Sequence, residues 1–261
     1  MKARHETGTV MKSNGELRIQ KEFLHKLSTE KGRIVIFDIG ANKGNWTMSL
    51  LDLISSKVHY DLEIHAFEPI YDTYTTLIRN IDVHPLGRYV KPVCKACSSD
   101  SGTGRMYVSE KNSGFSSFHP SNLHKDKSEK IEKTTIKDYC IENVIRRVHF
   151  IKSDTEGHEV EVLKGAINLI KEEKVYAFPF EYNQTWFYSR YFLKDIFDMI
   201  KDLPYSVGRI TPDGLYIIRE WHPEIDRFFD GNYIIMHKDA ISWFRHRTGR
   251  FDRDYYFRVE D

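Results

Sequence analysis

The chain has 261 residues, of which 40% are hydrophobic and 13% aromatic, enough to bury one sizeable core. Its 39 basic and 38 acidic residues leave a formal net charge of +1, which excludes a global electrostatic attraction to nucleic acid or to an anionic membrane. No run of about 18 apolar residues occurs, and residues 1–20 lack the apolar core of a signal peptide. We therefore expect a soluble, cytoplasmic protein without a membrane span.

The three cysteines, Cys94, Cys97 and Cys140, are an odd set that suits reduced thiols better than a disulfide framework. Cys94 and Cys97 have the spacing of a redox or zinc pair, but no second pair completes a tetrahedral site. We predict three reduced thiols without a redox or metal-binding role.

The first predicted elements are two strand–helix units. Apolar residues from Leu17 to Leu27 form a stripe typical of a helix. The run Ile34–Ile39 predicts a strand that ends in a glycine turn, with a helix over residues 46–53. A second strand over Glu63–Phe67 precedes another helical face, from Tyr74 to Ile81.

The unit then recurs with a long interruption. We predict a third strand over Tyr89–Ala96 and a polar, mobile loop from residue 98 to 130. The fourth and fifth strands and the helix between them follow at Val148–Ser153, Val175–Phe180 and Val160–Ile170. Strands that alternate with helices at this spacing predict a mostly parallel sheet with helices on both faces.

After residue 183 the pattern indicates antiparallel structure. A helix is expected over Tyr191–Leu203, and strands at Tyr205–Val207 and Leu215–Ile218 flank the turn Thr211–Gly214. A last strand covers Tyr233–Met236. We expect a hairpin that closes the sheet edge, in an α/β, Rossmann-like domain over residues 32–240. An N-terminal tail and covering helix take residues 1–31, and an arginine- and aromatic-rich tail, residues 241–261, packs on the domain or on a partner.

The glycine turn Phe37-Asp-Ile-Gly-Ala-Asn-Lys-Gly44 follows the first strand, where α/β sheets bind ligands. It lacks the G-x-G-x-x-G spacing that crowds amides around a pyrophosphate, which disfavours NAD and a dehydrogenase. S-adenosylmethionine carries no phosphate but an ammonium and a sulfonium, so a looser turn that begins with a carboxylate suits it. We expect the cofactor at Asp38, Gly40, Asn42, Gly44, Asn45 and Trp46.

Glu68 and Pro69 close the second strand, 24 residues after Gly44, where an acidic side chain accepts hydrogen bonds from two ribose hydroxyls. Taken alone, Glu68 is better explained as a surface carboxylate; combined with the glycine turn at this interval, it predicts ribose binding. After the third strand, Ser99 and Asp100 are candidate adenine contacts.

Three segments resemble the signatures of FkbM-type methyltransferases: Phe37–Gly44, Ala66-Phe-Glu-Pro69 and Ile151-Lys-Ser-Asp-Thr-Glu-Gly-His-Glu-Val-Glu-Val-Leu-Lys-Gly-Ala166. The resemblance spans roughly residues 34 to 183. It implies a class I methyltransferase fold, S-adenosylmethionine and methylation of oxygen, with sugars and polyketide-type metabolites among the family's acceptors. Which acceptor this chain uses does not follow from the motif. His158 stands where the family more often has a small residue.

Asp154, Glu156 and His158 follow the fourth strand and are our candidates for the base that removes the acceptor proton. Glu156 could instead charge the start of the next helix, and His158 could simply begin it. No metal is required, but Asp154 and Glu181 could together hold a divalent cation that acidifies the hydroxyl.

Two further segments leave alternatives open. The stretch that contains Ser113, Ser116, Ser117, Phe118 and His119 could close over the acceptor or be an ordinary loop. The aromatic residues from Trp186 to Phe192 could stack on a sugar or pack in the core.

The main prediction is an O-methyltransferase that acts on a sugar, glycan or small metabolite. The alternatives are a ribose methyltransferase of nucleic acid, against which the net charge argues, and a cofactor-binding scaffold without turnover. Homo-oligomerisation stays open.

Overall fold

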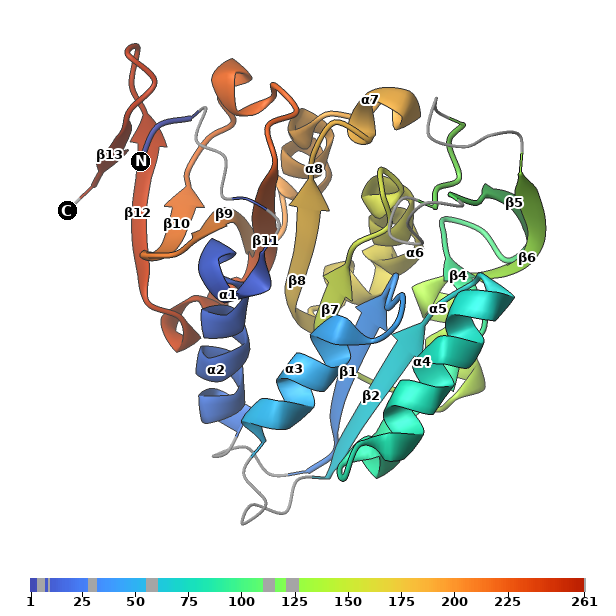
Figure 1. Ribbon diagram of the computed structural model, residues 1–261. Helices are drawn as coiled ribbons and strands as arrows, with labels where there is room; N and C mark the ends of the chain where they lie inside the picture. The colour runs from blue at the N-terminus through green and yellow to red at the C-terminus, as the bar shows by residue number, and fades with distance from the viewer. Residues whose placement is uncertain are drawn as a thin grey trace.

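The computed structural model describes residues 1–3, 8, 10–27, 32–54, 61–109, 116–120 and 127–260. Its described part contains a ten-stranded sheet, in the order β13-β12-β10-β9-β11-β8-β7-β1-β2-β3, and a three-stranded sheet, β4-β6-β5 (Figure 1). The α/β, Rossmann-like prediction is confirmed. No described helix is long and apolar enough to cross a membrane.

Five strands form the parallel part of the large sheet: β1 (Ile34–Ile39), β2 (Leu62–Phe67), β3 (Val90–Val93), β7 (Val148–Ser153) and β8 (Val175–Tyr182). Every residue of β1 is buried, because helices cover both faces of the sheet. From β1 the chain proceeds outward in one direction through β2 and β3, and later in the other through β7 and β8. The carboxyl ends of β1 and β7 therefore flank the switch point at which such sheets bind ligands.

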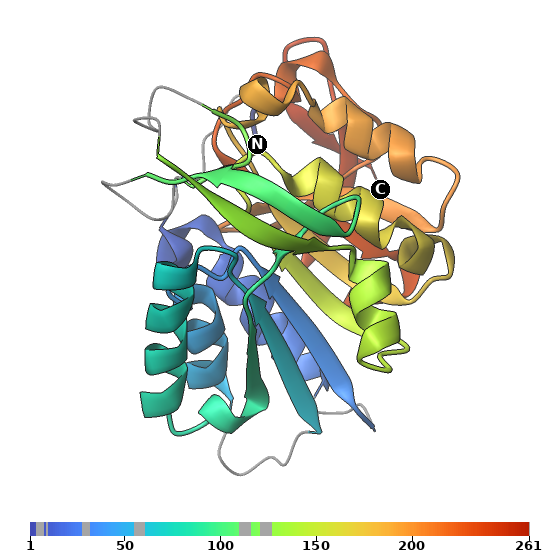
Figure 2. The ribbon, with the colours of Figure 1, turned by 90° about the vertical axis from the view of Figure 1, so that its right-hand side faces the viewer.

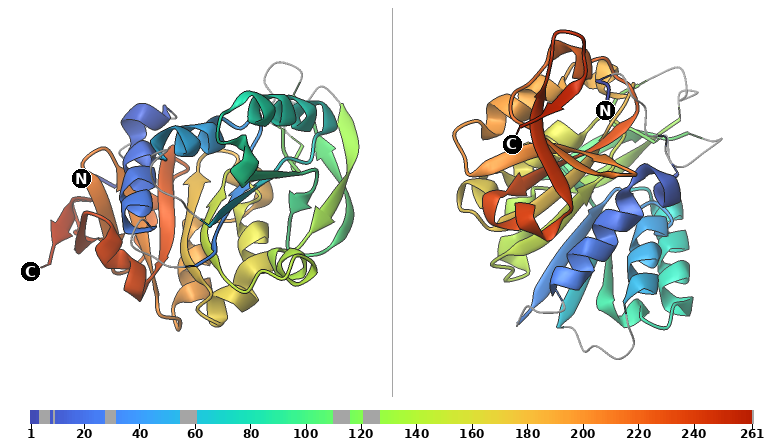
Figure 3. Two further views of the ribbon diagram at one scale, coloured as in Figure 1. Left: turned by 90° about the horizontal axis from the view of Figure 1, so that it is seen from below. Right: turned by 90° about the vertical axis from the view of Figure 1, so that its left-hand side faces the viewer.

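Helices lie on both faces of this sheet (Figure 3). Residues of α2 and α3 pack with Ile34 and Ile36 on one face, and residues of α5, α6 and α8 pack with Val35 and Phe37 on the other. The bounds of the helices are α1 Met11–Asn14, α2 Glu16–Leu27, α3 Asn45–Leu53, α4 Tyr71–Val83, α5 Ile136–Glu142, α6 Glu159–Lys171, α7 Trp186–Ser189 and α8 Leu193–Ile200.

The antiparallel end contains the predicted hairpin, β9 (Tyr205–Thr211) with β10 (Gly214–Ile218). Strand β11 (Gly231–His237) lies between β8 and β9 and is antiparallel to both. The arginine- and aromatic-rich tail adds β12 (His246–Phe251), parallel to β10, and β13 (Phe257–Val259). The amide of Ala3 donates to the carbonyl of Tyr255, so the first residues lie beside the last strands.

The predicted third strand and the long polar loop need correction. Residues 87–89 form a 3-10 turn and β3 ends at Val93, whereas β4 (Ala96–Cys97) belongs to the second sheet. There it pairs with β6 (Ser128–Thr134), which also pairs with β5 (Gly102–Tyr107); Figure 2 shows this ribbon in green. Only Ile131 and Thr134 of β6 are buried, so its composition resembles that of a loop. Residues 110–115 and 121–126 lie outside the described part.

Candidate active site

A cavity of about 510 Å³ opens at the carboxyl ends of β1, β2 and β7. Among the predicted site residues, those that line it are Gly40, Asn42, Glu68, Pro69, Asp154 and Glu156. The second sheet closes its far side with Ala96, Cys97 and Met106.

Gly40 makes the turn after β1 and has a φ of +75°. A Cβ on it would lie 1.9 Å from the carbonyl oxygen of Asp154, so no side chain is accommodated here. Gly44, at φ +88°, precedes α3, and a Cβ there would lie 2.7 Å from a methyl group of Leu77. The two glycines thus allow β1, β7 and α4 to approach the turn closely.

Glu68 is buried at the end of β2, with an exposed fraction of 6%. One carboxylate oxygen accepts from the amide of Asn42 at 3.0 Å, and the other accepts from the amide of Ile70 at 2.9 Å. Burial raises the pKa of Glu68 to about 7, although both hydrogen bonds oppose that shift. The carboxylate is therefore held rigidly at the cavity wall, with lone pairs that can still accept hydroxyl hydrogen bonds.

Asp38 lies beneath the glycine turn and does not line the cavity. It is fully buried, accepts a hydrogen bond from the hydroxyl of Thr47 at 2.6 Å, and lies 3.7 Å from the ammonium of Lys152. Burial raises its pKa, while Lys152 opposes that shift. Asp38 therefore anchors the turn to α3 and to β7.

Lys152 is buried between two carboxylates and was missed by the sequence analysis. Its ammonium lies 3.0 Å from Asp154 and 3.7 Å from Asp38. Desolvation would lower the pKa of Lys152, but the nearby carboxylates, Asp154, Asp38 and Glu16, outweigh it and raise that pKa. Lysine is seldom buried without such partners, so its position in an apolar strand followed by an aspartate was the available signal.

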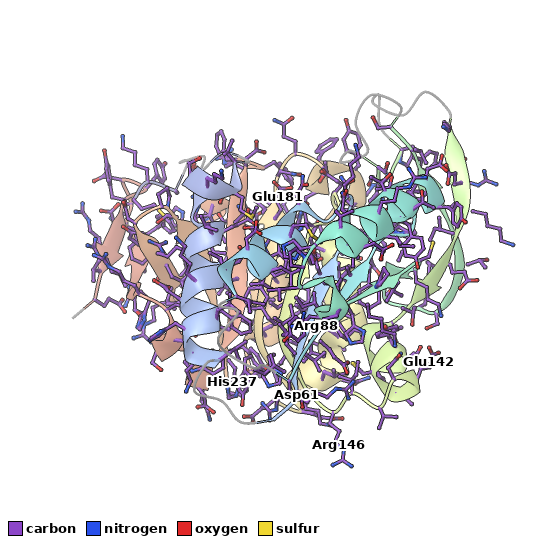
Figure 4. The ribbon with its side chains drawn as sticks, turned by 60° about the horizontal axis from the view of Figure 1, so that its bottom comes forward. Asp61, Arg88, Glu142, Arg146, Glu181 and His237 are labelled. Carbon is purple, nitrogen blue, oxygen red and sulfur yellow. The ribbon has the colours of Figure 1, made fainter. Side chains whose placement is uncertain are left out.

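Three carboxylates, Asp154, Glu156 and Glu181, converge beyond β7 and β8. One oxygen of each lies within 4.8 Å of the others, close enough to hold a hard divalent cation. Burial and the neighbouring acids raise the pKa of Glu156 to about 9, and burial and Asp154 also raise the pKa of Glu181. At neutral pH Glu156 thus favours the protonated form. Figure 4 labels Glu181 at the end of the molecule opposite Glu142.

A second, smaller cavity of about 220 Å³ lies beside this cluster. Asp154 lines both cavities, whereas Glu16, Glu181 and Asn232 line the second. Glu16 begins α2 and was not identified as a site residue from the sequence; burial raises its pKa. Asp154 is therefore the carboxylate common to the two spaces.

His158 turns away from the first cavity, although it directly precedes α6. Its Nε2 lies 3.0 Å from the hydroxyl of Ser98, and its ring stacks on Phe118 with centroids 4.1 Å apart. Burial lowers the pKa of His158 to about 3, so the ring is neutral at physiological pH. Phe118 lines the cavity, and the hydroxyl of Ser117 donates to the carbonyl of Glu156 at 2.8 Å. Part of the predicted closing segment thus lies over the site, whereas Ser113 lies outside the described residues.

The remaining predicted residues do not reach the cavity. Gly44 and Asn45 serve the start of α3, and Trp46 stacks on Phe150 in the core, with ring centroids 5.7 Å apart. Asp100 lies on the surface, where its carboxylate binds the ammonium of Lys133 at 2.7 Å. These side chains therefore contact other neighbours than the cavity.

The thiols are free, as predicted. Cys97 and Cys140 are buried and Cys94 is half-buried. Burial raises the pKa of all three, which makes them poor nucleophiles at neutral pH.

Comparison with known proteins identifies methyltransferases that are similar to this chain. The chain is 30% identical over 145 residues to the hexuronic acid methyltransferase AglP of Haloferax volcanii, an alignment that covers 52% of each protein. The chain thus spans about half the length of that curated relative. The solved structure of methyltransferase FkbM from Methylobacillus flagellatus KT is similar at a TM-score of 0.50 and 17% identity, over 82% of this chain and 47% of that one. A precorrin-6y C5,15-methyltransferase from Geobacter metallireducens GS-15 has a TM-score of 0.42 at 13% identity, over 85% and 88% of the two chains.

The family profile of the methyltransferase FkbM domain matches residues 38–207, from the aspartate under the glycine turn to the middle of β9. That match takes in all lining residues of the first cavity and the carboxylate cluster, and it covers well over half of the chain. The chain belongs to the FkbM methyltransferase domain family.

Proposed function

We propose that this chain binds S-adenosylmethionine and transfers its methyl group to a hydroxyl oxygen of a sugar. The observation that carries the proposal is the position of Asp154, which lines both the cavity that contains Glu68 and the smaller cavity beside Glu181. A methyl donor and an acceptor hydroxyl can meet at the boundary between these spaces, next to a carboxylate.

The residues that line the first cavity suit S-adenosylmethionine. The carboxylate of Glu68 can accept from both ribose hydroxyls, and Gly40 and Asn42 line the same cavity on the side proposed for the amino-acid end. Ala96, Cys97, Met106 and Phe118 provide an apolar slot for the adenine. S-adenosylmethionine supplies a methyl group on a sulfonium, already activated for in-line displacement.

The acceptor side needs alignment and a proton acceptor. Asp154 accepts the hydroxyl proton as the oxygen forms its bond to the methyl carbon and the carbon–sulfur bond breaks. Glu156, whose pKa of about 9 favours the protonated form at neutral pH, can donate a hydrogen bond to another oxygen of the acceptor. Lys152, 3.0 Å from Asp154, orients that carboxylate.

The relative from Haloferax volcanii supports a sugar acceptor, because its name gives a hexuronic acid as the methylated compound. The net charge of +1 gives no support to a long phosphate footprint, as a ribose methyltransferase of RNA would need. We therefore place a sugar before nucleic acid.

Calorimetric titration with S-adenosylmethionine, S-adenosylhomocysteine and NAD tests the cofactor. Micromolar binding of the first two, without NAD binding, is expected. Glu68→Gln should weaken it by about tenfold or more, because one ionic acceptor of two hydroxyls is lost. Glu142→Gln, an exposed carboxylate at the opposite end of the sheet, is the control. Absence of binding to wild type would overturn the proposal.

Transfer of a labelled methyl group to glucuronide glycosides, neutral glycosides and RNA tests the reaction. The proposal predicts an alkali-resistant methyl ether on a sugar, and a loss of kcat by roughly 10²–10⁴ in Asp154→Asn. An alkali-labile ester would show that a carboxylate oxygen is the acceptor instead. Binding without transfer to any of these would favour a cofactor-binding scaffold.

A further inference from the structure

An exposed aromatic surface lies directly after β8, on α7 and the connection to α8. Phe187, Tyr188 and Phe192 have exposed fractions of 66%, 45% and 46%. Phe187 contacts Tyr188 edge-on at 5.8 Å between centroids, and the partly buried Phe228 joins Phe187 to Phe192 at 6.2 and 5.6 Å. We call these four residues the aromatic platform. Clustered exposed rings of this kind mark binding surfaces.

Two aromatic residues of this segment differ from the platform: Trp186 is buried, and the partly buried Tyr191 packs against the core. The indole nitrogen of Trp186 donates to the carbonyl of Glu181 at 3.0 Å. It holds α7 in place, so the exposure of Phe187 and Tyr188 is a consequence of how the helix is anchored. Core packing and sugar stacking were both compatible with the sequence of this cluster, and the structure buries Trp186 but leaves Phe187 and Tyr188 exposed.

The platform is rigidly connected to the carboxylate cluster. The amide of Asn183 donates to Glu181 at 2.8 Å, and the Asn183 oxygen accepts from the backbone of Thr185 at 2.8 Å. The carbonyl of Thr185 packs against Gly157, where a Cβ would lie 2.7 Å away. Figure 1 shows α7 at the end of the sheet to which β1 and β7 point. The platform therefore continues the acceptor side of the site outward.

The platform also carries positive charge. Arg190 directly follows α7, has a left-handed φ of +62° and is exposed. In the sequence it stands between Tyr188 and Phe192. Among the residues that the structure describes, no ion pair is recorded for it. Lys194, the second residue of α8, lies 5.7 Å from the ring of Trp221 but pairs with Asp198 at 2.6 Å, so Arg190 is the residue that supplies the charge. Exposed rings with a nearby arginine match an anionic ring compound better than a neutral apolar surface.

We propose that the aromatic platform binds a second sugar ring of an anionic saccharide whose neighbouring ring receives the methyl group. The inference rests on the proposed function and narrows its substrate class to oligosaccharides that carry carboxylates. The C–H face of a pyranose packs on an aromatic face, its hydroxyls stay in water, and Arg190 binds a carboxylate.

The test compares a tetrasaccharide that alternates uronic acid and neutral sugar with a single uronic acid glycoside. Phe187→Ala and Phe192→Ala should each raise KM for the tetrasaccharide roughly five- to tenfold. They should leave the KM of the single glycoside and the Kd of S-adenosylhomocysteine unchanged. Ile141→Ala, 67% exposed at the other end of the sheet, is the matched control. Equal effects on both substrates, or none on either, would overturn the platform.

Arg190→Gln adds a charge-specific readout. It should raise KM roughly two- to fivefold for the tetrasaccharide but not for the same compound with its carboxylates reduced to alcohols. Intrinsic fluorescence titration of the tetrasaccharide against the S-adenosylhomocysteine complex measures binding without turnover. Sugar binding that depends on Phe187 supports the platform even where no transfer occurs, whereas cofactor binding without transfer to any sugar counts against the proposed function alone.

Two other occupants are outcomes of the same set of variants. If Phe187→Ala converts a dimer to a monomer in sedimentation experiments and leaves the tetrasaccharide KM unchanged, the platform is a contact between copies. If it abolishes binding to anionic vesicles with the same unchanged KM, the platform binds lipid. Either result would overturn the saccharide assignment.

Discussion

The two sides of the candidate site are built in different ways. On the β1 and β2 side, the backbone turns at Gly40 and contacts the Asp154 carbonyl so closely that a Cβ would lie 1.9 Å from that oxygen. On the β7 and β8 side, carboxylates gather within 4.8 Å of one another, and Lys152 lies at their base. The β1 and β2 side thus depends on the absence of a side chain at Gly40. The β7 and β8 side depends on the balance of charge between its carboxylates and Lys152.

This difference determines how each side responds to substitution. An atom added to Gly40 would displace the backbone of Asp154. Such a change would alter the shape of the cavity and its affinity for the cofactor together. A changed charge on the carboxylate side leaves the shape in place but shifts protons and stability. The following predictions separate the two sides, beginning with the largest expected effect.

Lys152→Met tests the charge balance. The substitution leaves Asp38 buried without a cation and Asp154 without its partner, so the free energy of unfolding should fall by about 3–5 kcal/mol. Urea denaturation at pH 7 measures this loss. Lys91→Met, an exposed lysine that donates to the Asn143 side chain at 2.7 Å, should change stability by less than about 0.5 kcal/mol. Equal stability of the two variants would show that Lys152 does not neutralise the β7 and β8 side.

Gly40→Ala tests the β1 and β2 side. The new Cβ meets the Asp154 carbonyl, and the φ of +75° adds strain, so we expect a loss of about 2–3 kcal/mol in unfolding free energy. Gly102→Ala is the control, because it has a φ of +136° with nothing within 4 Å of the Cβ, and it should cost only about 1 kcal/mol. If thermal denaturation shows the same loss of unfolding free energy for both variants, the positive φ alone explains why glycine is required at position 40.

The same contrast explains what could be read from the sequence. Gly40, Gly44 and Glu68 were identifiable because a glycine turn and an acid after the next strand form a local pattern. The parallel strands were predictable because burial on both faces produces continuous apolar runs, such as Ile34–Ile39. Which of these strands lie side by side in the sheet could be inferred from the fold class.

Charge pairing across strands left no comparable pattern. Lys152, Asp38 and Glu16 come from three elements that meet only in the folded chain, so their association could not be deduced from spacing. Asp100 follows β4, and the second sheet turns it toward Lys133; that sheet was itself missed because its β6 strand is mostly polar. Side-chain direction at the end of a strand depends on such tertiary contacts.

Cofactor affinity should depend on pH through Glu68. Burial raises its pKa to about 7, so the carboxylate is increasingly protonated below that pH, and only the ionised form accepts both ribose hydroxyls. The Kd of S-adenosylhomocysteine should therefore rise by up to about tenfold per unit as pH falls below 7 and be constant above about 8. Calorimetry in buffers of different ionisation enthalpy should detect one proton released at pH 6.

Glu68→Gln is the control for this pH dependence. The variant cannot ionise at position 68, so its weaker binding should not change between pH 6 and 8. A slope that persists in the variant would assign the titration to another group of the cavity.

The smallest effect is expected at His158. Its ring contacts Ser98 and Phe118 instead of the cavity, and burial lowers its pKa to about 3, so the structure gives it no position from which to take the acceptor proton. His158→Asn should therefore lower kcat by less than about threefold, far below the roughly 10²–10⁴ expected for loss of a base. The KM for S-adenosylmethionine should rise slightly, because Phe118 loses its stacking partner at the cavity wall. A large fall in kcat with unchanged cofactor affinity would instead mean that the ring reaches the acceptor during turnover, and the assignment of the base to Asp154 would then be wrong.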